Sequence, residues 1–231
     1  MKLRGRWQPH CLKPHVLKTI IMCFIYRKKA KKRMSQNQEI QKDQKIIKPV
    51  KFLFIGRTGA GKSVIAHSIC EKLGLKQVKS LTTRHPRNEN EKNDSWDHYF
   101  VSNEEFDSIG NREGFVAYTE INGNRYATTF DELDKSDIYV IDPAGVKILK
   151  EACGDQYKFI EIYIRVPYRL NEQRFIDRGG TKQEFKNRYD DESIQFAEYE
   201  KEQMFDYHLL NDKPLEESVD IVCEWIKKEL S

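Results

Sequence analysis

Gly56-Arg57-Thr58-Gly59-Ala60-Gly61-Lys62-Ser63 is the stretch that decides the fold, because it matches the pattern G-x-x-x-x-G-K-[ST] at every fixed position. In front of it, residues 50–55 form a short apolar run of strand type, and behind it residues 64–73 have the pattern of a helix. A strand, a glycine-rich turn and a helix therefore follow one another. This succession predicts a phosphate-binding loop.

The residue types of this loop fit the chemistry of a nucleoside triphosphate. Glycines let backbone N–H groups converge on a small space, and the start of the following helix adds partial positive charge. We expect Lys62 to reach the β- and γ-phosphates and the Ser63 hydroxyl to ligate Mg²⁺. ATP and Mg²⁺ are the predicted ligands, and the predicted ATP site is the whole loop: Gly56, Arg57, Thr58, Gly59, Ala60, Gly61, Lys62 and Ser63.

Strands and helices alternate along the rest of the chain. Short apolar strands are expected at residues 75–79, 137–142, 159–164 and 207–210, before a helix at 215–229. Each parallel pair of strands needs a right-handed crossover. The pattern predicts an α/β fold with three layers, α/β/α, around a mostly parallel sheet of five strands.

Residues 80–129 change this pattern. Strands are expected at 96–101 and 115–121, and Asn122-Gly123-Asn124 is a turn signal that returns the chain through 125–128 as a hairpin. We interpret this segment as a small mixed α/β insert beside the parallel sheet. It is a natural place to hold a second substrate.

Charge is distributed unevenly over the 231 residues. Residues 1–48 carry ten Lys and four Arg against two acidic residues, a net charge of +12, and the remainder has 26 basic and 34 acidic residues, a net charge of −8. An acidic body argues against nucleic acid as a partner. The five cysteines contain no C-x-x-C pair, which favours a reduced cytoplasmic location and no structural zinc.

The basic segment 1–48 is expected to be separate from the domain formed by residues 49–231. Its apolar stretch at 16–26 is too short to span a membrane, so no stable membrane association is expected. Three interpretations stay open: an amphipathic element at an anionic membrane surface, a disordered tail, or an overextended reading frame with its start at Met34. The polar composition of 35–48 favours the last two.

Several segments resemble the guanylate kinase family. Residues 80–87, 97–102 and 123–128 resemble its acceptor-binding insert, and residues 171–179 with Arg188 resemble its helical lid, placed here at 174–188. Asn211 and Asp212 resemble the end of its last core strand. The resemblance runs in unbroken order from about residue 51 to residue 230, and together with the phosphate-binding loop it is specific.

The resemblance implies a kinase, that is, a phosphotransferase of purine nucleotide metabolism. Its reaction would be ATP-dependent phosphorylation of a nucleoside monophosphate, GMP or dGMP first, and its partners would be small nucleotides. The implied ATP site also includes Asn211, and the implied catalytic residues are Lys62, Arg174, Arg178 and Arg188. The implied acceptor-binding residues are Ser80, Arg84, Arg87, His98, Tyr126, Thr128 and Asp142.

Three positions depart from the family's pattern. Ala117 stands in place of the glutamate that reads guanine, and Glu120, an odd number of residues away, should point to the opposite face of the strand. His98 stands in place of a phosphate-binding tyrosine, so either His98 or Tyr99 meets the acceptor phosphate. Val140 replaces an aspartate, leaving Asp142 to hold Mg²⁺ through water or to meet the acceptor base.

Other functions remain open beside the kinase. The Ala117 change fits a related kinase of another phosphorylated small molecule, such as a different nucleoside monophosphate or a ribose phosphate. A non-catalytic binding module would conserve the insert without the loop, whereas Lys62 and Ser63 are intact here. A GTPase switch would match Asp142-Pro143-Ala144-Gly145 as D-x-x-G but lacks an N-K-x-D base reader. Helix packing is the expected role of Phe185, Tyr189, Phe196 and Tyr199.

Overall fold

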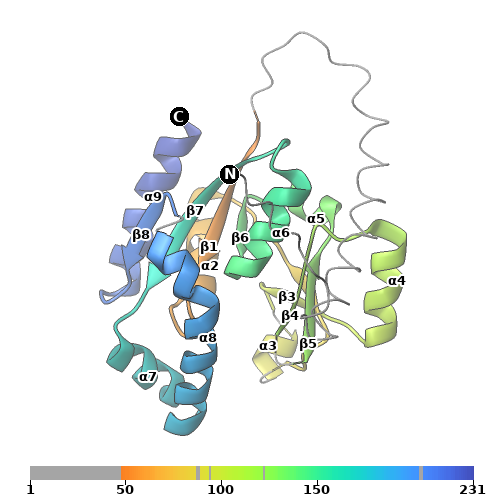
Figure 1. Ribbon diagram of the computed structural model, residues 1–231. Helices are drawn as coiled ribbons and strands as arrows, with labels where there is room; N and C mark the ends of the chain where they lie inside the picture. Colours follow the sequence, from red (N-terminus) through yellow and green to blue (C-terminus); the bar gives the residue numbers. More distant parts are fainter. Residues whose placement is uncertain (1–47, 87–88, 94, 122, 203–204) are drawn as a thin grey trace, which may run out of the picture.

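The computed structural model describes residues 48–86, 89–93, 95–121, 123–202 and 205–231 (Figure 1). The predictions made for residues 1–47 therefore lie outside the described residues, as does the side chain of Arg87. None of the helices within the described ranges has both the length and the apolar character needed to cross a membrane.

The core sheet contains four parallel strands among the described residues. They are β1 (Val50–Ile55), β6 (Ile138–Val140), β7 (Lys158–Arg165) and β8 (Tyr207–Leu210), in the order β6-β1-β7-β8. The prediction of a fifth strand at 75–79 is wrong, since this segment forms only an isolated parallel bridge between Gln77 and Ile138. The reason is that the chain leaves the core sheet almost at once, because residues 80–82 pair in the second sheet instead.

Helices cover both faces of the core sheet, which confirms the three-layered α/β/α architecture. The side chains of β1 alternate: Phe52 and Phe54 face α2 (Lys62–Leu73) and α9 (Leu215–Leu230), while Leu53 and Ile55 face α6 (Pro143–Cys153) and the long helix α8 (Lys182–Glu202). A parallel sheet buried on both faces needs apolar residues at almost every position. This explains why β1 and β7 were recognisable as apolar runs.

A second, mixed sheet lies beside the core sheet (Figure 1). Its strands are β2 (Ser80–Thr82), β3 (His98–Phe100), β4 (Ala117–Ile121) and β5 (Asn124–Thr128), in the order β3-β2-β5-β4. Only β2 and β3 pair in parallel. The predicted hairpin is confirmed, and Gly123 at its tip has the positive φ of 74° that a tight turn requires.

Four helices complete the described chain: α3 (Glu89–Asn93), α4 (Asn103–Glu113), α5 (Phe130–Asp134) and α7 (Tyr168–Asp177). Helix α4 begins with a capping box between Ser102 and Glu105, and its Phe106 is fully buried against the second sheet. In Figure 1, α7 and α8 stand on one side and the second sheet on the other. The phosphate-binding loop lines a pocket together with residues of α8 and of the second sheet.

Candidate active site

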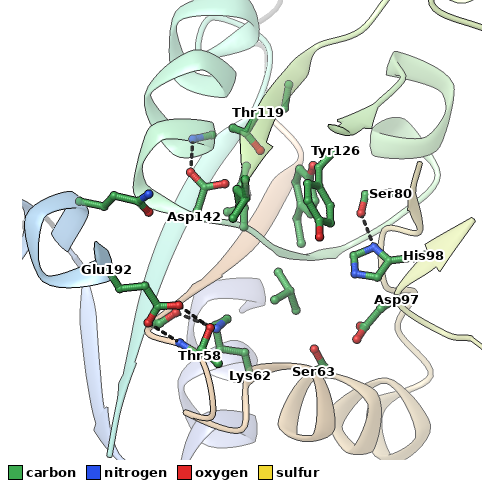
Figure 2. Close-up of a pocket in the computed structure, with 18 of the residues that line it drawn as sticks. Thr58, Lys62, Ser63, Ser80, Asp97, His98, Thr119, Tyr126, Asp142 and Glu192 are labelled. Atoms are coloured by element: carbon green, nitrogen blue, oxygen red, sulfur yellow. Dashed lines mark hydrogen bonds between the residues drawn. The ribbon is translucent and has the colours of Figure 1, made fainter. Parts of the chain in front are cut away.

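One pocket brings the loop, the second sheet and helix α8 together (Figure 2). Lys62 and Ser63 line it from the loop and α2, Ser80 and Tyr126 line it from the second sheet, and Arg188 lines it from α8. These residues are up to 126 positions apart in the sequence, as the numbers of Lys62 and Arg188 show. The pocket therefore brings the phosphate-binding loop and the second sheet together, and which substrate each side binds stays a prediction.

The loop has the backbone conformation of an anion cradle. Gly59 and Gly61 have φ angles of 80° and 88°, a region that favours glycine. Lys62 Nζ donates to the carbonyl oxygens of Gly56 at 2.7 Å and Arg57 at 3.0 Å, so the loop wraps around its own lysine. Burial lowers the pKa of Lys62 to about 8, because a charged amine is poorly solvated there.

Asn211 supports this loop from behind. Its side chain is buried, its Nδ2 donates to the carbonyl oxygen of Ala60 at 2.8 Å, and its Oδ1 accepts from the Ser218 hydroxyl at 2.9 Å. A Cβ on Gly61 would lie 2.6 Å from Asn211 Nδ2. Both polar ends of the Asn211 side chain thus bind protein groups, and Asn211 shapes the phosphate-binding loop.

Arg57 turns away from the pocket and ties the loop to α8. Its guanidinium donates to both carboxylate oxygens of Glu200, at 3.0 and 2.9 Å, and to Ser193 Oγ at 2.6 Å. It also lies over the ring of Tyr189 at 4.5 Å. Burial would raise the pKa of Glu200, but the hydrogen bonds from Arg57 and Tyr163 hold that pKa below its ordinary value. The Arg57 side chain therefore connects the loop to α8 and does not line this pocket.

The three arginines of the predicted lid lie close to one another, and two of them, Arg178 and Arg188, also lie near the loop. Arg188 lines the pocket, and Arg178 Nη2 lies 3.4 Å from the position of a Cβ on Gly59. Desolvation and the neighbouring guanidiniums of Arg188 and Arg174 lower the pKa of Arg178, although its side chain is still partly exposed. Like charges held together in this way favour an anionic ligand.

The acceptor-type side carries Ser80, Arg84, His98 and Tyr126. The Ser80 hydroxyl lies 2.8 Å from His98 Nδ1, and the His98 and Tyr126 rings meet edge to face at 5.7 Å. Arg84 forms a bidentate ion pair with Glu91 of α3, at 2.7 and 3.1 Å. Of the two alternatives for the acceptor phosphate, His98 lines the pocket, while Tyr99 is 45% exposed and lies under the Lys79 ammonium.

The inner end of the pocket contains small and hydroxyl-bearing side chains. Ala117 and Thr119 line it from β4, and Glu120 between Thr119 and Ile121 is exposed, which confirms that Glu120 points to the other face. Thr128, a predicted acceptor-binding residue, pairs with Ala117 across the sheet but does not line the pocket, and within the described ranges its buried hydroxyl makes no hydrogen bond of normal geometry.

Asp142 caps helix α6. Its Oδ1 accepts from the Gly145 N–H at 2.9 Å. Burial raises the pKa of Asp142, while hydrogen bonds from the N–H groups of Gly145 and Ala144 and from the Thr119 hydroxyl act against that rise. A carboxylate offers about four lone-pair sites, and these donors use most of them. Holding the start of α6 in place is therefore its visible role.

Ser63 and Asp97 supply oxygen atoms that fit a divalent cation. Figure 2 shows both side chains at the start of α2, and both line the pocket. Within the described residues no group of three or more His, Cys, Asp or Glu side chains could hold a metal ion by itself. Mg²⁺ binds many proteins through one or two protein oxygens together with substrate phosphates, and Ser63 and Asp97 could supply such oxygens.

Thr119, Asp97 and Glu192 are among the pocket residues that were not predicted as site residues from the sequence. Thr119 follows Ala117 by two positions, so the alternation used for Glu120 could have found it. Asp97 carried no separate signal beyond its place in the resembling segment. Glu192, whose carboxylate accepts from the Thr58 N–H at 2.9 Å, could be found only by knowing that α8 crosses the loop.

Comparisons with known proteins agree on one family. A family model described as guanylate kinase matches residues 48–229. A guanylate kinase of Francisella tularensis subsp. holarctica (strain LVS) is 30% identical over 190 residues, covering 78% of this chain and 96% of that protein. One from Fusobacterium nucleatum subsp. nucleatum is 32% identical over 84 residues, which are 36% of this chain and 44% of that protein.

Among solved structures, the crystal structure of guanylate kinase from Anaplasma phagocytophilum has the same fold. It matches with a TM-score of 0.54 and 21% sequence identity, over 79% of this chain and 86% of that one.

Proposed function

Because this chain belongs to the guanylate kinase family, we propose that it transfers the γ-phosphoryl group of Mg-ATP to a nucleoside monophosphate, with GMP or dGMP as the first acceptors to test. The observation that supports this most directly is that a phosphate-binding loop and the Arg84, His98 and Tyr126 side chains face one pocket. Two phosphate groups could meet there.

The proposed roles follow from electrostatics. An oxygen of the acceptor phosphate attacks the γ-phosphorus in line, and ADP leaves. Lys62 and the cluster of Arg174, Arg178 and Arg188 neutralise the charge that two anions bring together. Mg²⁺ would be held by Ser63 with Asp97 nearby, and it would supply further positive charge at the phosphates. The attacking oxygen is already anionic, so no general base is needed.

The acceptor base would meet the inner end of the pocket. Ala117 presents a methyl group there, and the Thr119 hydroxyl, which donates to Asp142, can still accept a hydrogen bond. Position 117 supplies no carboxylate to a base, so we propose weak selection of guanine over other bases. This feature also supports the second candidate, a kinase of another phosphorylated small molecule.

An acceptor panel tests the proposal. ADP release is measured with GMP, dGMP, AMP, IMP, UMP and ribose phosphates, and stimulation by GMP or dGMP is expected. If ATP turnover is slow and no acceptor changes its rate, the proposed kinase function is wrong. If only a ribose phosphate stimulates release, the second candidate is correct.

A matched pair of variants tests the base site. Ala117→Glu introduces a carboxylate into the pocket and should raise the preference for GMP over IMP by about tenfold or more, because a charge-assisted hydrogen bond is worth roughly 1.5–3 kcal/mol. Glu120→Gln, on the exposed face of the same strand, should leave the ratio unchanged. An unchanged ratio in Ala117→Glu would show that the base does not lie against Ala117.

A cytoplasmic location stays a prediction.

A further inference from the structure

Glu192 of α8 places a carboxylate on the phosphate-binding loop (Figure 2). Its Oε2 accepts from the Thr58 N–H at 2.9 Å, and its Oε1 accepts from the Thr58 hydroxyl. Arg188, one helical turn earlier, donates to the same Oε1 at 3.4 Å. The Glu192 side chain is only 16% exposed. A backbone N–H, a hydroxyl and a guanidinium thus converge on this one anion.

These donors are the kinds of group that bind a phosphate oxygen. Thr58 belongs to the loop itself, and Arg188 belongs to the cluster of arginines beside it. Glu192 is also the acidic neighbour that contributes most to holding the positive charge of Lys62. A carboxylate and a phosphate cannot share the same donors, because two close anions repel each other.

We propose that Glu192 is a positioning residue that stands in for a donor phosphate: it holds Thr58 and Arg188 in place in the free protein and leaves them when the donor's phosphates enter. This inference rests on the proposed function, because it takes the loop to be the donor site. It predicts that the donor binds more weakly than it would without the Glu192 carboxylate. It also predicts that Arg188 exchanges its hydrogen bond to Glu192 for one to a phosphate.

The movement required is small. Helix α8 is fixed to the loop by Arg57, which donates to Ser193 at 2.6 Å and to Glu200 at 3.0 and 2.9 Å. Ser193 is the residue next to Glu192, so the backbone at this point is anchored. We therefore expect the Glu192 side chain to rotate, without displacement of the helix, and so to release Thr58 and Arg188.

The acceptor side has the same kind of arrangement, since Arg84 is held by Glu91 at 2.7 and 3.1 Å. On each side of the pocket, a carboxylate of the free protein thus accepts hydrogen bonds from residues that are predicted to bind phosphate. Glu192 is the sharper case because it contacts the backbone of the loop.

Calorimetric titration of the full chain with Mg-ATP, Mg-ADP and pyrophosphate, without acceptor, tests the inference. Glu192→Ala and the near-isosteric Glu192→Gln remove the charge, and both should bind ATP and pyrophosphate about ten- to a hundredfold more tightly than the parent. Glu198→Gln is the matched control, because it removes an acidic residue from an exposed position of the same helix. It should change these affinities less than about twofold.

A kinetic measurement separates this role from a merely structural one. In both Glu192 variants the KM for ATP should fall while the KM for the acceptor stays constant, whereas a distorted fold would change both and lower the melting temperature. Folded variants that bind ATP no more tightly than the parent would overturn the inference while leaving the proposed function intact. If the variants bind ATP more tightly but no acceptor is phosphorylated, the proposed function is wrong. The inference that Glu192 competes with phosphate at the loop would then still hold. Absence of ATP and pyrophosphate binding in all proteins would overturn both.

Discussion

Nucleotide binding should draw a proton onto Lys62 at alkaline pH. In the free protein, burial lowers the pKa of Lys62 from 10.5 to about 8. A bound phosphate places negative charge beside the ammonium group, which favours its charged form and raises the pKa again. At pH 9 about nine tenths of the free protein has a neutral Lys62, and at pH 7.5 about a quarter, by the ordinary titration relation. Binding therefore takes up about 0.9 proton at pH 9 and about 0.25 at pH 7.5.

The assay is calorimetric titration with Mg-ADP in two buffers of different ionisation enthalpy at each pH. The difference between the buffers gives the number of protons taken up. The affinity of the parent should also fall by about eightfold from pH 7.5 to pH 9, because the protonated fraction falls from about 0.76 to about 0.09. Lys62→Arg stays charged at both pH values and should show neither effect. Equal proton uptake at the two pH values, together with unchanged affinity, would refute the assignment of Lys62 as a buried partner of phosphate.

Two further predictions concern the loop and its support, and a third concerns the core of the second sheet. Lys62→Ala should reduce turnover by orders of magnitude while acceptor binding stays detectable by calorimetry, and equal loss of both would indicate misfolding. Asn211→Ala leaves the Ala60 carbonyl and the Ser218 hydroxyl without their buried partner, so chemical denaturation should show a loss of about 2–4 kcal/mol; a loss under about 0.5 kcal/mol would contradict the supporting role. Phe106→Ala empties the fully buried centre of the second sheet's core and should cost about 3–5 kcal/mol by the same method.

Local patterns were enough to predict much of the fold. The run 50–55 became β1 with the same limits, and Gly123 formed the expected hairpin, because a buried parallel strand and a tight turn leave signatures within a few residues. The prediction of a fifth core strand was wrong. Residues 80–82 join the second sheet, so only Gln77 pairs with the core sheet, through a single bridge to Ile138. Tertiary pairing decides this, and local sequence does not show it.

The site was predictable to the extent that its parts are local. The register of β3 decides that His98 faces the pocket and Tyr99 does not, and periodicity alone could not fix that register. For Asp142 the sequence left two roles open, Mg²⁺ binding through water or contact with the acceptor base. Its role as the N-cap of α6 was not predicted. Glu192 lies 134 positions from Thr58, so its contact depends on how α8 packs on the loop.

Phosphorus-31 magnetic resonance of a mixture of Mg-ATP, GMP and the protein tests the central claim most directly, because it follows each phosphate as it moves. If the γ-phosphoryl group of ATP is transferred to GMP, ADP and GDP form in equal amounts, and the signal of the GDP β-phosphate rises as that of the ATP γ-phosphate falls. Release of inorganic phosphate while GMP stays unchanged would contradict it.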